Sequence, residues 1–139
     1  VRRRAGELGI RVEFTGLLPH RSAMEQAAAA SAGLSLLRPL PNYLHSLPTK
    51  VVEYLEMGLP VVAADLPGTR AAVVGLAGVT LVPPSNPTAA AAALDRVVAD
   101  GEARRETACQ APGLRERLVW PSAEVVAVYR EAASRRAHH

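Results

Sequence analysis

Cysteine and aromatic residues are scarce in this sequence, and each scarcity argues against a class of protein. Cys109 is the only cysteine, so no disulfide forms within the chain, as is typical of proteins in the reducing cytoplasm. Aromatic residues make up 4% of the chain, too few for the stacking platforms that bind single-stranded nucleic acid. The pI is near 9.6, but the net charge is only +3, with acidic residues spread throughout. We therefore expect no nucleic-acid partner.

Several functional sequence patterns are also absent. No apolar stretch is long enough for a transmembrane helix, and no signal peptide opens the chain. The sequence has no Asp-x-Asp pair, no His/Cys/Asp cluster at metal-ligand spacing and neither glycine-rich phosphate fingerprint. We therefore expect no metal, no cofactor, no transmembrane segment and a cytoplasmic location. A phosphate group would have to be bound by the amino ends of helices.

Hydrophobic residues make up 49% of the 139 residues, which is enough for one domain with a real core. Their spacing alternates between the periods of strands and helices. Strands are predicted at residues 10–14, 33–37, 60–65 and 79–82. Helices are predicted at residues 1–9, 22–30, 48–57, 87–100 and 102–110, and after Ser122. This alternation predicts an α/β fold, a Rossmann-like parallel sheet with helices on both faces.

Prolines and polar residues give several expected boundaries. Asn86 followed by Pro87 predicts the start of a helix, and Pro112 predicts the end of the helix that starts near residue 102. The prolines within residues 38–43 predict a stiff loop without regular structure. The helix after Pro87 is expected to pack through an apolar stripe of Ala90, Leu94, Val97 and Val98.

The central stretch, residues 42–65, predicts a loop, a helix and then a strand buried on both faces. Ser46 is expected to cap the helix, Pro48 fits its first turn, and Gly58 is expected to end it. One face of this helix is expected to carry Val51, Val52 and Leu55, and the opposite face Lys50, Glu53, Tyr54 and Met57. Ligands of such folds bind where strands end and helices begin.

Lys50 and Glu53 lie one turn apart near the start of this helix, and they have two interpretations. They could form an ordinary surface ion pair, worth roughly 0.2–0.5 kcal/mol. Alternatively, Lys50 could bind a phosphate at the amino end of the helix. The composition favours the second interpretation, because Lys50 is the only lysine in a chain whose other strong bases are all arginine.

Residues 46–65, which read SLPTKVVEYLEMGLPVVAAD, resemble the signature of the donor-binding half of family 4-type retaining glycosyltransferases with GT-B architecture. That family typically shows a Glu-x7-Glu pattern, and Glu53, Gly58, Pro60 and Val61 match its second half. Three other parts of the chain resemble the family in the same order. These are residues 12–16 (VEFTG), residues 78–83 (GVTLVP), and Trp120 with Tyr129.

The resemblance implies that the chain is the carboxyl-terminal, donor-binding domain of such an enzyme. The first strand and loop of that domain, and the amino-terminal acceptor-binding domain, are then expected to lie outside residues 1–139. The missing acceptor domain is the expected protein partner and could place the enzyme peripherally at a membrane. The fragment alone is expected to be inactive.

The resemblance also implies roles for individual residues. Glu53 would bind the ribose hydroxyls of the donor. Lys50 and the backbone N–H groups around Pro48 and Thr49 would bind the diphosphate. Ser46 and His45 would lie nearer the sugar. The loop of Gly16, Leu17 and Leu18 would lie against the base, although these could equally be ordinary loop residues that cover the core.

Two positions depart from the family pattern. His45 stands where the first glutamate of the Glu-x7-Glu pattern is expected, and Ala71 stands where many members carry an acid. The glutamate ordinarily faces the donor sugar. His45 could hydrogen-bond a sugar hydroxyl, or it could simply flank the loop.

The implied function is the binding of a nucleotide-diphosphate sugar, with UDP or GDP as the nucleotide, by a metal-independent glycosyltransferase. The full enzyme would transfer a hexosyl-type group to a glycan, a lipid or a small molecule, with retention of configuration. The alternative from another class is a non-catalytic nucleotide-sensing or interaction module on the same fold. The residues leave the nucleotide, the sugar and the acceptor open.

Overall fold

The computed structural model describes residues 2–46, 48–117, 126–127 and 130 of the chain. Two compact units, Val1–Ala30 and Ser31–His139, are distinguished by their internal contacts. None of the helices in the described ranges is long and apolar enough to cross a membrane. The helix predicted after Ser122, with Trp120 and Tyr129, lies largely outside the described residues.

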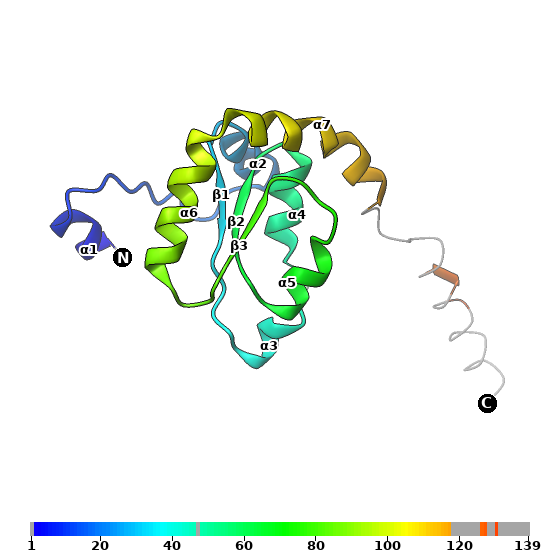
Figure 1. Ribbon diagram of the computed structural model, residues 1–139, viewed down its shortest axis with the longest axis horizontal. Helices are drawn as coiled ribbons and strands as arrows, with labels where there is room; N and C mark the ends of the chain where they lie inside the picture. The colour runs from blue at the N-terminus through cyan, green and yellow to red at the C-terminus, as the bar shows by residue number, and fades with distance from the viewer. Residues whose placement is uncertain (1, 47, 118–125, 128–129, 131–139) are drawn as a thin grey trace. The chain divides into compact units, whose positions relative to one another are not determined.

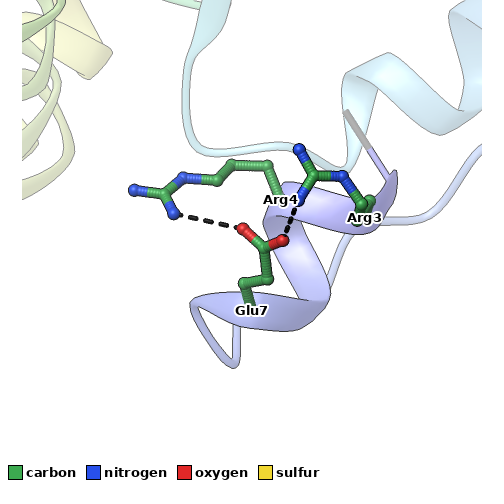
Figure 2. A network of polar contacts seen from close by, with 3 residues as sticks. All are labelled: Arg3, Arg4 and Glu7. Atoms are coloured by element: carbon green, nitrogen blue, oxygen red, sulfur yellow. Dashed lines mark hydrogen bonds and ion pairs between the residues drawn. The ribbon is translucent and has the colours of Figure 1, made fainter.

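The first unit contains two helices, α1 (Arg2–Glu7) and α2 (His20–Ala28). In α1 the Glu7 carboxylate accepts from Arg3 and, at 3.1 Å, from Nη1 of Arg4 (Figure 2). The single Glu7 carboxylate therefore offsets one of the two arginine charges along one exposed side of a short helix. Gly9 adopts a positive φ of 65° directly after α1, which agrees with the predicted helix end.

The strand predicted at residues 10–14 is wrong, because these residues form no regular secondary structure and are not part of the described sheet. Its alternating apolar residues Ile10, Val12 and Phe14 are all exposed. The guanidinium of Arg2 lies 4.1 Å from the centroid of the Phe14 ring and covers part of it. Alternation of apolar residues was therefore not enough to make a strand here, because a strand also needs a neighbour with which to pair.

The second unit is built on a parallel sheet in the order β1-β2-β3. Its strands are β1 (Gly33–Ser35), β2 (Val61–Ala64) and β3 (Val79–Val82). Gly33 pairs with Val61, and Val61 pairs with Val79. The predicted parallel α/β architecture is confirmed, and β1 is shorter than its predicted range of residues 33–37.

Helices cover both faces of this sheet (Figure 1). On one face α4 (Thr49–Glu56) packs against β1 and β2, where Val51, Leu55, Val61 and Ala63 form one cluster. On the other face α6 (Pro87–Ala99) packs against β2 and β3, where Val62, Val82, Ala90 and Ala93 form a second cluster. All four residues of β2 are buried, as predicted for a central parallel strand.

Helix α4 ends where the sequence predicted. Met57 is its C-cap, and Gly58 follows with a positive φ of 71°. Tyr54, however, was assigned to the outer face of the helix, and this is wrong, because its ring packs against the core cluster. The wide apolar stripe of the helix thus includes an aromatic residue whose hydroxyl can stay near solvent.

Helix α6 starts as predicted, because Pro87 is its first residue and the Asn86 side chain accepts from Ala89 N at 3.0 Å. Its apolar stripe was partly wrong. Ala93 is fully buried, whereas Val98 is 54% exposed. The face of α6 that packs on the sheet is therefore centred on Ala90 and Ala93, whose small side chains let the helix approach the sheet closely.

Prolines at two places begin or interrupt helices rather than exclude them. The loop predicted at residues 38–43 contains a short helix, α3 (Pro41–Leu44), with Pro41 at its first position. Pro112 lies inside α7 (Gly101–Arg117) instead of ending it. Packing holds α7 on both sides of this proline. The Gln110 amide bonds both backbone groups of Ala77 at 2.9 and 2.5 Å, and Leu114 is buried in the core.

We predict that Leu55→Ala lowers the free energy of unfolding by about 2–5 kcal/mol, because it leaves a cavity between α4 and β2. Val98→Ala on α6 should change this free energy by no more than about 0.5 kcal/mol, because Val98 is already largely in solvent. Urea unfolding followed by far-UV circular dichroism measures both values. Equal losses in the two variants would contradict this division of the core.

Candidate functional site

A pocket opens in the second unit where β1 ends and α4 begins. Its volume is about 380 Å³. One wall comes from β1 and the residues after it, Leu34, Ser35, Leu36 and Leu37. The other wall comes from Tyr43, Ser46, Pro48, Thr49 and Lys50. The structure thus brings together four of the predicted site residues, which are Ser46, Pro48, Thr49 and Lys50.

The start of α4 leaves polar backbone groups available to this pocket. Pro48 is the N-cap of the helix, and no side chain among the described residues caps it. The Val51 N–H already donates to the Pro48 carbonyl at 2.9 Å. Thr49 and Lys50 come first in the helix, where N–H groups have no intrahelical partner. The predicted backbone donors are therefore those of Thr49 and Lys50, since proline has no N–H.

Ser46 does not cap α4, and that prediction is wrong. Its Oγ donates instead to the carbonyl oxygen of Tyr43 at 3.3 Å. This bond closes the turn between α3 and the residues that lead into α4. Because the hydroxyl retains acceptor capacity, Ser46 can still bind a ligand group from the pocket wall.

Lys50 and Glu53 are arranged differently from the surface-pair interpretation. Lys50 is exposed at the pocket wall, and Glu53 is half-buried one turn further along α4. No ion pair joins the two side chains, both of which are described. The Lys50 ammonium is therefore available to an anion at the amino end of α4, where the helix dipole also favours negative charge.

His45 and Glu53 are not among the described residues of the pocket wall. His45 is the exposed C-cap of α3 and directly precedes Ser46. Its backbone lies against Gly68 of α5 (Pro67–Ala72), as does the carbonyl of Ser46. The loop of His45 and Ser46 is thus held between the pocket on one side and α5 on the other.

Gly16, Leu17 and Leu18 belong to the first unit. Gly16 has a positive φ of 69°, as the predicted turn requires, and the Leu17 side chain is fully exposed. Contact of this loop with a nucleotide base stays a prediction.

Sequence reasoning missed the part of the pocket that β1 supplies. Leu34 and Leu36 are both exposed, at 44% and 47%, although both lie within the strand predicted at residues 33–37. The rule that ligands bind at the carboxyl ends of parallel strands was the available signal for this wall. Among the described residues, no group of three or more His, Cys, Asp or Glu side chains could hold a metal ion.

Comparison with known proteins gives one match. The family model described as "Glycosyl transferases group 1" matches residues 1–100, which include β1, α4, β2 and β3. No curated protein and no solved structure matches the chain. The matched residues contain the whole pocket, so the family assignment and the geometry concern the same part of the molecule.

We predict that inorganic pyrophosphate slows acylation of Lys50 by an amine-reactive ester, because the anion would cover the ammonium at the start of α4. Lys50 is the only lysine, so peptide mass spectrometry can follow this reaction without interference from other lysines. Sodium chloride at matched ionic strength controls for screening. Alkylation of the exposed Cys109 should keep its rate in both salts. An unchanged acylation rate at saturating pyrophosphate would contradict the site.

Proposed function

Since this chain belongs to the glycosyl transferases group 1 family, we propose that its pocket between β1 and α4 binds the diphosphate of a nucleotide-sugar donor. The observation that carries the proposal is the position of Lys50. The only lysine of the chain lines a pocket of about 380 Å³ beside an uncapped helix start. A diphosphate matches this combination of a point charge and open backbone donors.

The proposed donor extends from this diphosphate in two directions. Glu53, one turn along α4 from Lys50, would accept hydrogen bonds from the ribose hydroxyls of a UDP or GDP moiety. Ser46 and His45, on the other side of the helix start, would contact the hexosyl group. The loop of Gly16, Leu17 and Leu18 would contact the base. From ribose to sugar, this order follows the order of Glu53, Lys50, Ser46 and His45 along the chain.

The proposed reaction is transfer of the hexosyl group to an acceptor hydroxyl with retention of configuration. The bond between the anomeric carbon and the diphosphate oxygen breaks, and a bond to the acceptor oxygen forms. The nucleoside diphosphate leaves with the electron pair of the broken bond and takes up the proton that the acceptor hydroxyl releases. Lys50 and the first N–H groups of α4 would stabilise the negative charge that develops on the leaving diphosphate, without a metal.

A second candidate is a nucleotide-sensing module that binds the donor without transferring its sugar. One observation favours it. His45 stands at the position where the resemblance predicts a glutamate that faces the sugar. Both candidates bind nucleotide sugars, and only the first releases nucleoside diphosphate when an acceptor is present. Assay of that release separates them.

Lys50→Ala should lower the affinity for UDP and GDP by about tenfold or more. The affinity for uridine and guanosine, which have no diphosphate, should stay nearly the same. A charge-assisted contact is worth about 1.5–3 kcal/mol, and the lower end applies because Lys50 is exposed. Lys50→Arg should retain part of the affinity, and Arg96→Ala on α6 is the control for loss of one exposed positive charge. Isothermal titration calorimetry measures these affinities. Equal losses for nucleoside and diphosphate in Lys50→Ala would leave Lys50 with no role in binding the diphosphate.

Glu53→Gln, measured by the same titrations, should lower the affinity for ribonucleotides more than the affinity for their 2′-deoxy counterparts. Glu56→Gln, three residues along α4, is its control. An identical loss of affinity for the ribo and 2′-deoxyribo nucleotides would refute the contact between Glu53 and the ribose.

His45→Ala should lower the affinity for nucleotide sugars more than the affinity for the corresponding nucleoside diphosphates, because the side chain is proposed to contact the hexosyl group alone. His45→Glu restores the residue that the resemblance predicts and should keep the affinity for the free diphosphate. Competition titrations of UDP against UDP-glucose, and of GDP against GDP-mannose, measure the difference. If His45 only flanks the loop, all three proteins will show the same ratio of affinities.

A further inference from the structure

Gly68 lies closer to the loop of His45 and Ser46 than any residue with a side chain could. A Cβ built on Gly68 would lie 2.6 Å from the Ser46 carbonyl oxygen. It would also lie 2.8 Å from the His45 carbonyl carbon and 3.1 Å from its Cα. All three are backbone or Cα atoms, so no rotation of a side chain relieves the contact.

The conformation of Gly68 does not itself require glycine. It lies in the first turn of α5 and is not one of the glycines with a positive φ. Alanine is a better helix former than glycine, so an isolated helix would favour alanine here. What excludes a side chain is therefore the neighbouring loop.

Helix α5 cannot easily move away to make room. Leu66 and Thr69, which flank Gly68, are 1% and 3% exposed. The N–H of Arg70 donates to the Leu66 carbonyl at 2.8 Å, and the Arg70 side chain pairs with Asp65 at the end of β2. Helix α3, which precedes the loop, packs against α5, as Figure 1 also shows. These contacts make α5 the fixed side of the approach.

The start of α4 is also fixed, because Pro48 is buried and Val51 is fully buried. A side chain at position 68 would therefore displace mainly His45 and Ser46. Ser46 forms part of the pocket wall, whereas Lys50 lies beyond the buried anchor. The displacement should thus change the two ends of the pocket unequally.

We infer that Gly68 is a positioning residue that sets where His45 and Ser46 lie, and so determines recognition of the sugar rather than of the diphosphate. This inference rests on the proposed function, because it takes His45 and Ser46 to be the residues nearest the donor sugar. Gly68 itself has no side chain with which to contact a ligand. It would act through the distance between two backbone segments.

The test compares Gly68→Ala with the wild-type chain in binding UDP, GDP and their hexose conjugates. Gly68→Ala should lose roughly fivefold or more in affinity for the nucleotide sugar, because a shift of about 1 Å in His45 and Ser46 would break their contacts with the hexose. The loss for the free diphosphate should be less than about twofold, because Lys50 and the buried start of α4 would stay in place. Gly68→Ser, with a larger side chain, should lose more affinity for the sugar. A loss shared equally by sugar nucleotides and free diphosphates would overturn the inference.

Two glycines supply matched controls. Gly101→Ala adds a Cβ that meets nothing within 4 Å and should bind as the wild type does. Gly33→Ala places a Cβ 2.4 Å from Cδ2 of Tyr54, so it strains the core away from the loop. It should lower stability without changing the ratio of sugar-nucleotide to diphosphate affinity. A change in this ratio for Gly33→Ala would assign the effect of Gly68→Ala to general destabilisation.

A measurement on the wild-type chain does not depend on the variants folding. Titration with a nucleotide sugar should shift the backbone amide resonances of Ser46 and Gly68, and the free diphosphate should shift them less. The amide of Gly101 should not move. If the sugar nucleotide binds but the Gly68 amide resonance does not shift, the inference about Gly68 is overturned and the proposed function still stands. Absence of any nucleotide-sugar binding by the wild type would instead overturn the proposed function, and the role of Gly68 with it.

Discussion

Burial of β2 on both of its faces is the constraint on which the second unit depends. Val61, Val62 and Ala63 have no exposed surface, and Ala64 has 2%. Such a strand needs an apolar layer on each side, which α4 and α6 supply, and parallel neighbours on both edges, which β1 and β3 supply. Connections between parallel strands return the chain across a face of the sheet. The segment after β1 therefore passes through α3 and α4 at the edge where the pocket lies.

Most of the polarity that suits this pocket for an anion comes from backbone rather than from charged side chains. Its walls include four residues of the β1 segment and a single lysine, Lys50. The uncapped start of α4 adds N–H groups whose direction is fixed by the buried residues Pro48 and Val51. The proposed preference for a diphosphate would therefore depend on how the fold places the start of α4. The proposed preference among nucleotides and sugars would come instead from the side chains of His45, Ser46 and Glu53, of which Ser46 lines the pocket.

The parts of the fold that sequence predicted well are those whose signal is local, such as a continuous apolar run, a glycine stop or a polar cap before proline. The β2 strand, the end of α4 at Gly58 and the start of α6 at Asn86 are of this kind. Residues 10–14 show the limit, because alternation gives a segment an apolar face but a strand also needs a neighbour. Pro112 shows another limit. Its local effect opposes a helix, yet the anchors at Gln110 and Leu114 hold α7 together on both sides.

The candidate site divides in the same way. The residue types at the start of α4 indicated phosphate chemistry, and the structure places Ser46, Pro48, Thr49 and Lys50 around one pocket. The approach of Gly68 to the loop could not be predicted, because in the sequence Gly68 is only a glycine after a proline. Its significance arises from a backbone approach of 2.6 Å that exists once α5 and the loop before α4 have folded. A glycine that is required by a contact, and not by its own φ, has no local signature. In this pocket the residues at the start of α4 could therefore be picked out from the sequence, whereas the approach of Gly68 to the loop could not.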